Sequence, residues 1–425
     1  MKFIDLKLSN NVLEAINEVG YVEATPIQEK VIPDVISGND IVGCAQTGTG
    51  KTAAFAIPIV NSLHRIVGSG KKVKYIRTVI LAPTRELAQQ LGENFDLFTP
   101  YTSIKSLVIY GGVNQVPQVN QLKEGVDVLI ATPGRFLDLY KQGFINLNHM
   151  HHLVIDEADL MLDMGFINDV KKIIKLSPEN RQTLLFSATM PLEVRELADE
   201  FLTRPKYISV DPISSASDNV SHQAYLVEKE NKRNLLNHII KTKELKNILV
   251  FVRTKQGADA TKESLLKNGI KADSIHGDKS QTARNAVLES FKNKEIDVLI
   301  ATDVAARGID IEGLPLVINF DLPNIPETFV HRIGRTGRAG ASGLAVSFCS
   351  KDEKTYLTDI EKHLRFKIKI VKDNPFPWRE IDPKNEGKKD YRKKYNPGAD
   401  KKTGNSNNGA SRKSENSKKN KKRWY

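Results

Sequence analysis

The sequence predicts an α/β protein with two similar halves, each built around a parallel β-sheet. Short continuous runs of Val, Ile and Leu recur along the chain, and segments with helical spacing of apolar residues separate them. Runs without strict alternation are typical of strands covered on both faces, as in a parallel sheet of βαβ units. The string Asp-Val-Leu-Ile-Ala-Thr occurs twice, at 127–132 and at 297–302, which supports two related halves.

The individual elements follow from these patterns. Predicted strands of the first half lie at 41–44, 78–82, 107–110, 126–130, 153–155 and 183–186, and those of the second half at 248–252, 297–302, 316–320 and 344–348. Apolar residues at helical spacing predict helices that include 85–91 and 193–201.

Composition divides the chain further. We expect a first domain at 1–206, a Pro- and Ser-containing linker at 207–218, a second domain at 219–370 and a tail at 371–425. Residues 379–425 hold 16 Lys and Arg but 6 Asp and Glu, so most of the net charge of +12 lies there and the rest of the chain is nearly neutral. Because this tail has few aliphatic residues, it is predicted to be disordered.

The chain of 425 residues is long enough for two or three domains with cores of their own. Its two cysteines, Cys44 and Cys349, each lie in or at the end of an apolar run, which indicates free thiols in a reducing compartment. No apolar stretch has the length of a secretory signal or a membrane span. We therefore expect a soluble cytoplasmic protein without a membrane partner.

The strongest chemical motif is Ala-Gln-Thr-Gly-Thr-Gly-Lys-Thr at 45–52, between the predicted strand 41–44 and a helix start. A glycine-bearing turn there presents backbone N–H groups and the positive end of a helix dipole to a phosphate chain. The predicted cradle is formed by Gln46, Thr47, Gly48, Thr49 and Gly50. Lys51 would reach the β- and γ-phosphates, and the Thr52 hydroxyl would hold Mg²⁺. Two points weigh against this: a P-loop pattern opens with Gly rather than Ala45, and a Thr- and Gly-rich connection can be a plain loop.

A second motif, Asp-Glu-Ala-Asp at 156–159, directly follows the predicted strand 153–155. Ligands of open parallel sheets bind beyond the carboxyl ends of the strands, so these carboxylates should lie beside the phosphate loop. Asp156 is the candidate for Mg²⁺, and Glu157 is the candidate for orienting and deprotonating an attacking water. The alternative is an acidic, solvated turn.

These motifs, with others in the same order, resemble those of the DEAD-box ATP-dependent RNA helicases of superfamily 2, and most of all the bacterial RhlE-like branch. The resemblance covers about residues 3–370, and the family's own phosphate loop begins with Ala. It implies two tandem RecA-like domains, ATP and Mg²⁺ as cofactors, and single-stranded or short duplex RNA as a largely sequence-independent partner. The further motifs are 20–28 (GYVEATPIQ), 83–88 (PTRELA), 111–112 (GG), 132–135 (TPGR), 187–189 (SAT), 250–252 (VFV), 301–310 (ATDVAARGID) and 331–338 (HRIGRTGR).

The resemblance also assigns nucleotide contacts. Gln28, in a Q motif at 1–29, matches the glutamine that reads the adenine edge, Tyr21 and Phe3 match aromatic residues near the base, and Thr25 would fix that loop. Phe3 could equally be an ordinary core residue. In the second domain, Arg335 and Arg338 match arginines that stabilise charge on the γ-phosphate, and Gly308 and Asp310 match the group that contacts the ribose.

RNA contacts are implied in both domains. Hydroxyl, glycine-backbone and guanidinium groups suit phosphate and 2′-OH contacts better than base edges. The same arginines could instead belong to helix ends or surface ion pairs. The implied RNA contacts are Thr84, Arg85, Gly112, Thr132, Arg135, Gln281, Arg284 and Thr302, and the residues implied to couple ATP to RNA are Asp159, Ser187, Thr189 and His331.

The function expected from this resemblance is local unwinding or remodelling of RNA duplexes and RNA–protein complexes, driven by RNA-stimulated ATP hydrolysis. Ribosome assembly or RNA decay is the expected setting, with proteins of those processes as candidate partners. Two alternatives remain, namely a helicase that also acts on DNA and an RNA-binding clamp scaffold with little unwinding. The basic tail, with Tyr391, Tyr395, Trp424 and Tyr425, would either tether RNA or only aid solubility.

Overall fold

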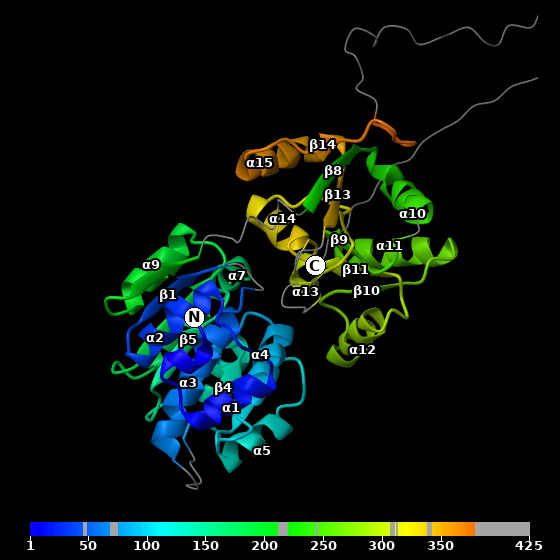
Figure 1. Ribbon diagram of the computed structural model, residues 1–425. Helices are drawn as coiled ribbons and strands as arrows, with labels where there is room; N and C mark the ends of the chain where they lie inside the picture. Colours follow the sequence, from blue (N-terminus) through cyan, green and yellow to red (C-terminus); the bar gives the residue numbers. More distant parts are fainter. Residues whose placement is uncertain are drawn as a thin grey trace, which may run out of the picture. The chain divides into compact units, whose positions relative to one another are not determined.

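The structure is a computed structural model, and it describes residues 1–45, 49–68, 75–210, 220–243, 245–306, 311, 313–337 and 342–378. Two seven-stranded sheets form its framework (Figure 1). Their strand orders are β3-β4-β2-β5-β6-β1-β7 and β10-β11-β9-β12-β13-β8-β14. Every neighbouring pair of strands within the two sheets is parallel, which confirms the predicted fold class.

The first sheet and its helices take up residues 3–209. Its elements are η1 (Phe3–Leu6), α1 (Asn10–Glu18), α2 (Pro26–Ile36), β1 (Ile41–Cys44), α3 (Lys51–Val67), β2 (Thr78–Leu81), α4 (Arg85–Phe98), β3 (Ser106–Ile109), α5 (Val116–Glu124), β4 (Val128–Ala131), α6 (Pro133–Lys141), β5 (His152–Ile155), α7 (Ala158–Asp163), α8 (Ile167–Leu176), β6 (Gln182–Ser187), α9 (Leu192–Phe201) and β7 (Lys206–Ser209).

The second sheet and its helices follow from residue 220. Its elements are β8 (Val220–Leu226), η2 (Lys229–Asn231), α10 (Lys232–Lys243), β9 (Ile248–Val252), α11 (Lys255–Lys267), β10 (Ala272–Ile275), α12 (Gln281–Lys292), β11 (Val298–Thr302), α13 (Asp303–Ala306), β12 (Leu316–Asn319), α14 (Pro326–Ile333), β13 (Gly343–Cys349), η3 (Lys351–Glu353), α15 (Lys354–Leu364) and β14 (Lys369–Ile370).

The continuous apolar runs are explained by two cores, one on each face of the first sheet. Successive residues of a strand point to opposite faces. Thus Leu184 and Phe186 of β6 pack with residues of α1 to α4, whereas Leu185 packs with residues of α5 to α9. Because both faces of the sheet are buried, a polar residue at every second position of a strand would place unpaired polar groups in one of the cores.

The two sheets are built on one plan, and their registers can be superimposed residue by residue. Thr78 of β2 pairs with Val128 of β4, and Ile248 of β9 pairs with Val298 of β11 in the same relative places. Both pairs of equivalent positions are 170 residues apart. The repeated hexapeptides at 127–132 and 297–302 have the same separation, so their identity reflects equivalent strands.

The structured segments differ from the predicted ones at several places. Strand β7 pairs with β1 and extends the first sheet to Ser209, inside the predicted linker 207–218. After β14 the backbone of Val371 and of Trp378 bonds to β8, within the predicted tail. Strands β7, β8, β10 and β14 were not predicted, because runs such as Lys206–Ser209 and Ala272–Ile275 alternate with polar residues or lie at a sheet edge. The rest of the tail, from residue 379, lies outside the described residues.

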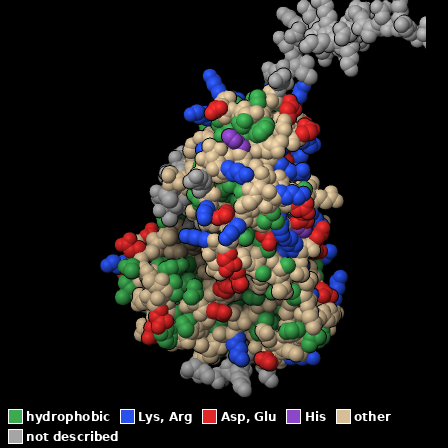
Figure 2. Space-filling view, turned by 90° about the vertical axis from the view of Figure 1, so that its right-hand side faces the viewer, with side chains coloured by type: hydrophobic (Ala, Val, Ile, Leu, Met, Phe, Trp, Pro, Cys, Tyr) green, Lys and Arg blue, Asp and Glu red, His purple; other side chains and the backbone are tan. Residues whose placement is uncertain are grey.

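The surface carries both signs of charge. Figure 2 shows Lys and Arg side chains interspersed with Asp and Glu over the face in view, in agreement with the near neutrality of the first 378 residues. Both cysteines are free, with Cys349 buried and Cys44 partly buried. Among the described residues, no helix is long and apolar enough to cross a membrane.

Candidate active site

The phosphate loop ends in a glycine that introduces α3. Gly50 has φ 90° and ψ 22°, a left-handed conformation that favours glycine. Lys51 follows as the first residue of the helix, and only 6 % of it is exposed. Its Nζ has no hydrogen-bond partner in the part of the chain that the structure describes. Because an unpaired buried ammonium is costly, this position fits an anionic ligand.

The Q motif packs directly on this glycine. Thr25 and Gln28 form a capping box at the start of α2, in which Gln28 Oε1 accepts from the Thr25 N–H at 2.9 Å. Gln28 Nε2 donates to the Gly50 carbonyl at 3.2 Å, and the Thr25 hydroxyl donates to the Thr49 carbonyl at 2.9 Å. One amide hydrogen and one lone pair of Gln28 remain for a base. The link between Gln28 and the phosphate loop was not predicted from sequence.

The two aromatic residues of this motif are not equivalent. Phe3 is 2 % exposed and belongs to the core, which is the alternative that the sequence left open. Its ring stacks on Tyr21 at a centroid distance of 6.1 Å, and Tyr21 also contacts Phe98 at 6.2 Å. Tyr21 is only partly buried. Of the two rings, that of Tyr21 therefore has exposed surface for a ligand, and the buried Phe3 ring packs against it.

Two carboxylates follow β5 at the edge of the sheet where its strands end: Asp156 is buried and Glu157 is half-buried. Burial raises the pKa of Asp156 and of Glu157, and the charge of Lys51 opposes that rise in both. Arg335 also lowers the pKa of Glu157, although by less than Lys51 does. Glu157 has φ 52°, a left-handed conformation that is rare for a residue with a side chain and recurs at functional sites. Asp156 Oδ1 accepts from the Glu157 N–H at 3.0 Å.

The fourth residue of the acidic motif connects β5 to β6. Asp159 Oδ2 accepts from both the N–H and the hydroxyl of Thr189, each at 2.8 Å. The Asp159 N–H in turn donates to the Ser187 hydroxyl at 3.1 Å. Asp159 and Ser187 are buried, so these are three bonds in a low-dielectric setting. Three of the four residues predicted to couple ATP to RNA thus form one bonded group.

The second domain presents its arginines from the end of α14. Arg332 is 3 % exposed and forms a bidentate pair with Asp303, with Nε–Oδ1 at 2.6 Å and Nη2–Oδ2 at 2.7 Å. Arg335 follows one turn later, and His331 precedes Arg332 in the helix. Arg338, Gly308 and Asp310 lie outside the described residues, as do Gln46, Thr47 and Gly48 of the phosphate loop.

The predicted RNA contacts of the first domain lie at strand ends. Thr84 and Thr132 precede α4 and α6, and the Thr84 hydroxyl accepts from the Leu87 N–H at 3.2 Å. The Arg85 guanidinium lies against Gly112, whose φ of 78° and lack of a side chain allow the approach. These groups are therefore brought together after β2, β3 and β4.

All three predicted RNA-binding arginines make contacts within the protein, and Arg85 Nη1 donates to Gln281 Oε1 at 3.4 Å. Arg135 donates to the Val113 carbonyl at 3.1 Å, which fixes the loop after β3. Arg284 forms an ion pair with Glu86 at 2.7 Å, and Gln281 Nε2 donates to the same carboxylate at 3.1 Å. Glu86, between Arg85 and Leu87, was missed as a partner of these residues. Thr302 ends β11 and is 7 % exposed.

The repeat between the sheets reveals a group that the motif search missed. Thr254 lies 170 residues after Thr84 and caps α11 as Thr84 caps α4, its hydroxyl accepting from the Gly257 N–H at 3.0 Å. Lys255 then corresponds to Arg85. Its Cε would lie 3.7 Å from a side-chain carbon built on Gly277, much as Arg85 lies against Gly112. The 170-residue offset of the repeated hexapeptide was the signal that could have found it.

Comparison with known proteins agrees with this geometry. Residues 25–197 match the DEAD/DEAH box helicase family, and residues 231–340 match the helicase conserved C-terminal domain. A protein of Limosilactobacillus reuteri, ATP-dependent RNA helicase CshA, is 41 % identical over 372 residues, which are 88 % of this chain and 74 % of that protein. The DEAD-box ATP-dependent RNA helicase CshA of Bacillus subtilis is 42 % identical over 371 residues, 87 % of this chain and 74 % of that protein.

The chain belongs to the DEAD-box ATP-dependent RNA helicases. A solved structure of Saccharomyces cerevisiae Dbp5 bound to RNA and ADP BeF3 is similar to this helicase with a TM-score of 0.77 and 29 % identity, and the match covers 87 % of this chain and 95 % of that one. Membership confirms the tandem RecA-like fold, the use of ATP and the RNA helicase activity expected from the sequence.

The residues of this helicase fit ATP with a divalent cation. The unpaired Lys51 ammonium fits a phosphate, and the Thr52 hydroxyl and the Asp156 carboxylate are oxygen donors of the kind that Mg²⁺ prefers. Bound there, the cation would neutralise charge on the phosphates. Burial raises the pKa of Asp156 and so disfavours its anion, which a bound cation would stabilise.

Proposed function

We propose that this helicase works as a clamp in which ATP and one RNA strand bind both RecA-like domains. The observation that supports it most is the corner formed by Lys51, Asp156 and Glu157. There the buried Lys51 ammonium, which has no hydrogen-bond partner among the described residues, lies beside two carboxylates of raised pKa. Lys51 binds phosphate, Asp156 and Thr52 hold Mg²⁺, and Glu157 orients and deprotonates the attacking water. Arg335 and Arg338 stabilise the charge on the γ-phosphate.

The Asp159–Ser187–Thr189 group supplies a route from this corner to RNA binding. Asp159 is three residues from Asp156, and Thr189 lies past the end of β6, so movement of one displaces the other through two bonds of 2.8 Å. We assign these residues, with His331, to coupling.

The proposed RNA path runs over the strand ends of both domains. In the first it uses Thr84, Arg85, Gly112, Thr132 and Arg135, and in the second Gln281, Arg284 and Thr302. From the repeat we add Thr254 and Lys255. Bending one strand along this path unstacks bases at a cost of a few kcal/mol per step. Stacking stabilises a duplex by only about 1.4 kcal/mol per base-pair step, so the loss of a few stacked steps would separate the strands of a short duplex locally.

The deciding experiment is steady-state ATP hydrolysis with no nucleic acid, with single-stranded RNA and with DNA of the same sequence. The clamp predicts that RNA accelerates hydrolysis and that DNA does not. Equal stimulation by both favours the DNA/RNA-directed alternative, and stimulation without strand separation of a short duplex favours the scaffold alternative. Lys51→Met should abolish hydrolysis in every arm, which controls for a contaminating ATPase.

The finer assignments remain predictions. The two relatives named above are CshA proteins, and they do not support the RhlE-like branch over others. Roles in ribosome assembly or RNA decay are proposed from the family alone, and co-purification with ribosomal particles against co-purification with RNA-decay proteins would separate them.

A further inference from the structure

The second sheet has a counterpart of the ATP corner. Strand β8 takes the place of β1 in the strand order, and β12 takes the place of β5. Lys232 begins the helix after β8, as Lys51 begins the helix after β1. By the register of β2 with β5 and of β9 with β12, Asp321 corresponds to Glu157. A lysine and a carboxylate therefore occupy equivalent corners in both domains.

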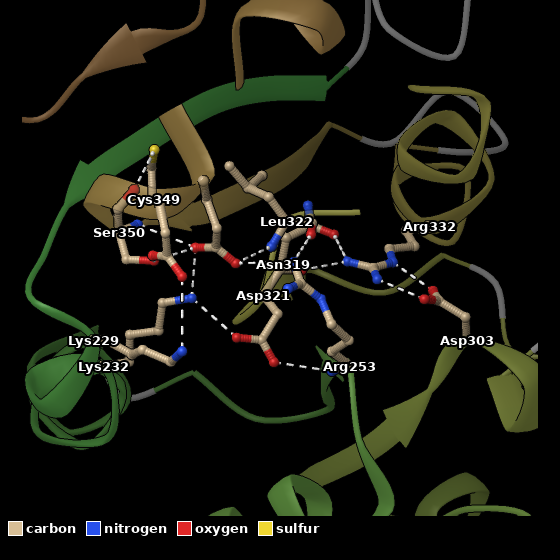
Figure 3. Close-up of polar contacts among 12 residues, drawn as sticks. Lys229, Lys232, Arg253, Asp303, Asn319, Asp321, Leu322, Arg332, Cys349 and Ser350 are labelled. Carbon is tan, nitrogen blue, oxygen red and sulfur yellow. Dashed lines mark hydrogen bonds and ion pairs between the residues drawn. The ribbon is translucent and has the colours of Figure 1, made fainter. Parts of the chain in front are cut away.

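In the second domain the lysine of this corner, Lys232, forms ion pairs within the protein. Lys232 is 2 % exposed, and its Nζ lies 3.0 Å from Asp321 Oδ1 and 2.7 Å from Glu353 Oε2 (Figure 3). The buried Glu353 carboxylate also accepts from the Ser350 N–H at 3.1 Å and from the Ser350 hydroxyl at 2.8 Å. Glu353 thus gives the Lys232 ammonium a hydrogen-bonded carboxylate, whereas Lys51 Nζ has no hydrogen-bond partner among the described residues.

The same carboxylate holds the turn after β12. Its Oε1 accepts from the Leu322 N–H at 3.2 Å and from Arg253 Nη2 at 3.3 Å. Arg253 Nη2 also donates to the Leu322 carbonyl at 2.8 Å, and the Arg253 N–H donates to Asp321 Oδ2 at 2.9 Å. The turn at 321–322 is consequently fixed by both its backbone and its side chain.

The other side of this turn anchors the helix that carries the arginines. The Asp321 carbonyl accepts from Arg332 Nη1 at 2.6 Å, and Asn319 Oδ1 accepts from the same nitrogen at 3.1 Å (Figure 3). Arg332 is further locked by its bidentate pair with Asp303. A continuous set of bonds therefore leads from Glu353 through the turn to Arg332, one helical turn before Arg335.

We propose that Glu353 is a positioning residue for Arg335. By collecting donors from Lys232, Ser350, Leu322 and Arg253, it fixes the turn at 321–322, which holds Arg332 and so sets where the end of α14 presents Arg335. The proposal rests on the role of Arg335 in the proposed function. Glu353→Gln would place an amide N–H against donors and leave an uncompensated buried positive charge, which loosens the turn.

The test is RNA-stimulated ATP hydrolysis by Glu353→Gln, Arg335→Ala and the double variant, with each fold checked by thermal unfolding. Since small misplacements of a catalytic group cost up to about 100-fold, Glu353→Gln should lower kcat by about 10- to 100-fold with KM for ATP within about twofold. In the Arg335→Ala background the same change should alter kcat by less than about twofold, because the two residues act as one unit.

Matched variants keep the outcomes distinct. Asp359→Asn removes an exposed carboxylate of α15, which pairs with Lys362 at 3.1 Å outside the cluster, and should leave kcat unchanged. If Glu353→Gln does not fold, Arg253→Gln is measured in its place. The Arg253 side chain is 49 % exposed, so this substitution leaves the buried contacts of Glu353 with Lys232 and Ser350 in place. Equal losses of kcat in both backgrounds, or an unchanged kcat in a folded variant, would overturn the positioning role. An unchanged kcat in Arg335→Ala alone would instead refute the proposed function of that arginine.

Discussion

Substitution of Gly112 by alanine tests how Arg85 is held at the predicted RNA surface. Gly112 has φ 78°, so a side chain there costs about 1 to 2 kcal/mol of stability through left-handed strain. Its Cβ would also lie 2.6 Å from Arg85 Cζ, too close for both groups to stay. Because the guanidinium is the flexible end of its side chain, we expect Arg85 to move away while the fold is kept.

The expected loss of RNA affinity follows from that displacement. One hydrogen bond from a charged group is worth about 1.5 to 3 kcal/mol, which corresponds to a roughly 10- to 150-fold weaker Kd. Fluorescence anisotropy with labelled single-stranded RNA and a non-hydrolysable ATP analogue would measure it, and hydrolysis without RNA should not change.

The adjacent glycine provides the control for this prediction. Gly111 has no left-handed φ, and a side-chain carbon built there meets no atom within 4 Å, so Gly111→Ala should bind RNA like the parent protein. Equal RNA affinity of Gly111→Ala and Gly112→Ala would refute the assignment of Arg85 to the RNA surface.

Four further predictions follow, two on the acidic motif, one on the repeat and one on the tail. Glu157→Gln should retain ATP binding and stop hydrolysis, and brisk single-turnover hydrolysis would exclude Glu157 as the base. Burial raises the pKa of Glu157 in the folded protein, so the parent protein loses stability as the pH rises through that raised value and Glu157→Gln does not. The difference in Tm should therefore grow with pH from about 4.5 upward, and a constant difference would contradict the burial argument. Thr254→Val should weaken RNA binding without changing hydrolysis in the absence of RNA, and anisotropy beside Thr84→Val would check it. If Thr84→Val alone weakened RNA binding, the two threonines would be equivalent in the fold but not in RNA binding. Removal of the residues after Trp378 should weaken RNA affinity and reduce its dependence on salt, whereas an unchanged dependence would favour a tail that only aids solubility.

Much of the first domain could be predicted because its motifs are continuous in sequence. Asp156 lies directly after β5, and Lys51 follows the loop that leaves β1. The topology of a parallel sheet brings such strand ends together. Topology alone therefore predicts that Lys51 and Asp156 lie close together, whereas the link of Asp159 to Ser187 and Thr189 was implied by the family resemblance.

Other features depended on partners that are distant in sequence. Pattern alone could not show that Gln28 bonds to Gly50, that Phe3 belongs to the core, or that Arg284 is neutralised by Glu86, because each partner comes from another element. Arg332 lies in the Gly- and Arg-rich motif 331–338, and pattern alone did not predict the buried ion pair with Asp303 that makes it part of the core. Edge strands such as β14 are short and exposed, so they lacked the apolar signal that identified the central strands.

The internal carboxylate of the second domain also bears on stoichiometry. Two domains share one framework, but Lys232 is saturated by Glu353 and Asp321, so the second corner offers its cation to no nucleotide. Each chain should then bind a single ATP, and saturation of hydrolysis with ATP should be hyperbolic with a Hill coefficient near one. The energy of one hydrolysis event per cycle is therefore all that a single chain can apply to its RNA.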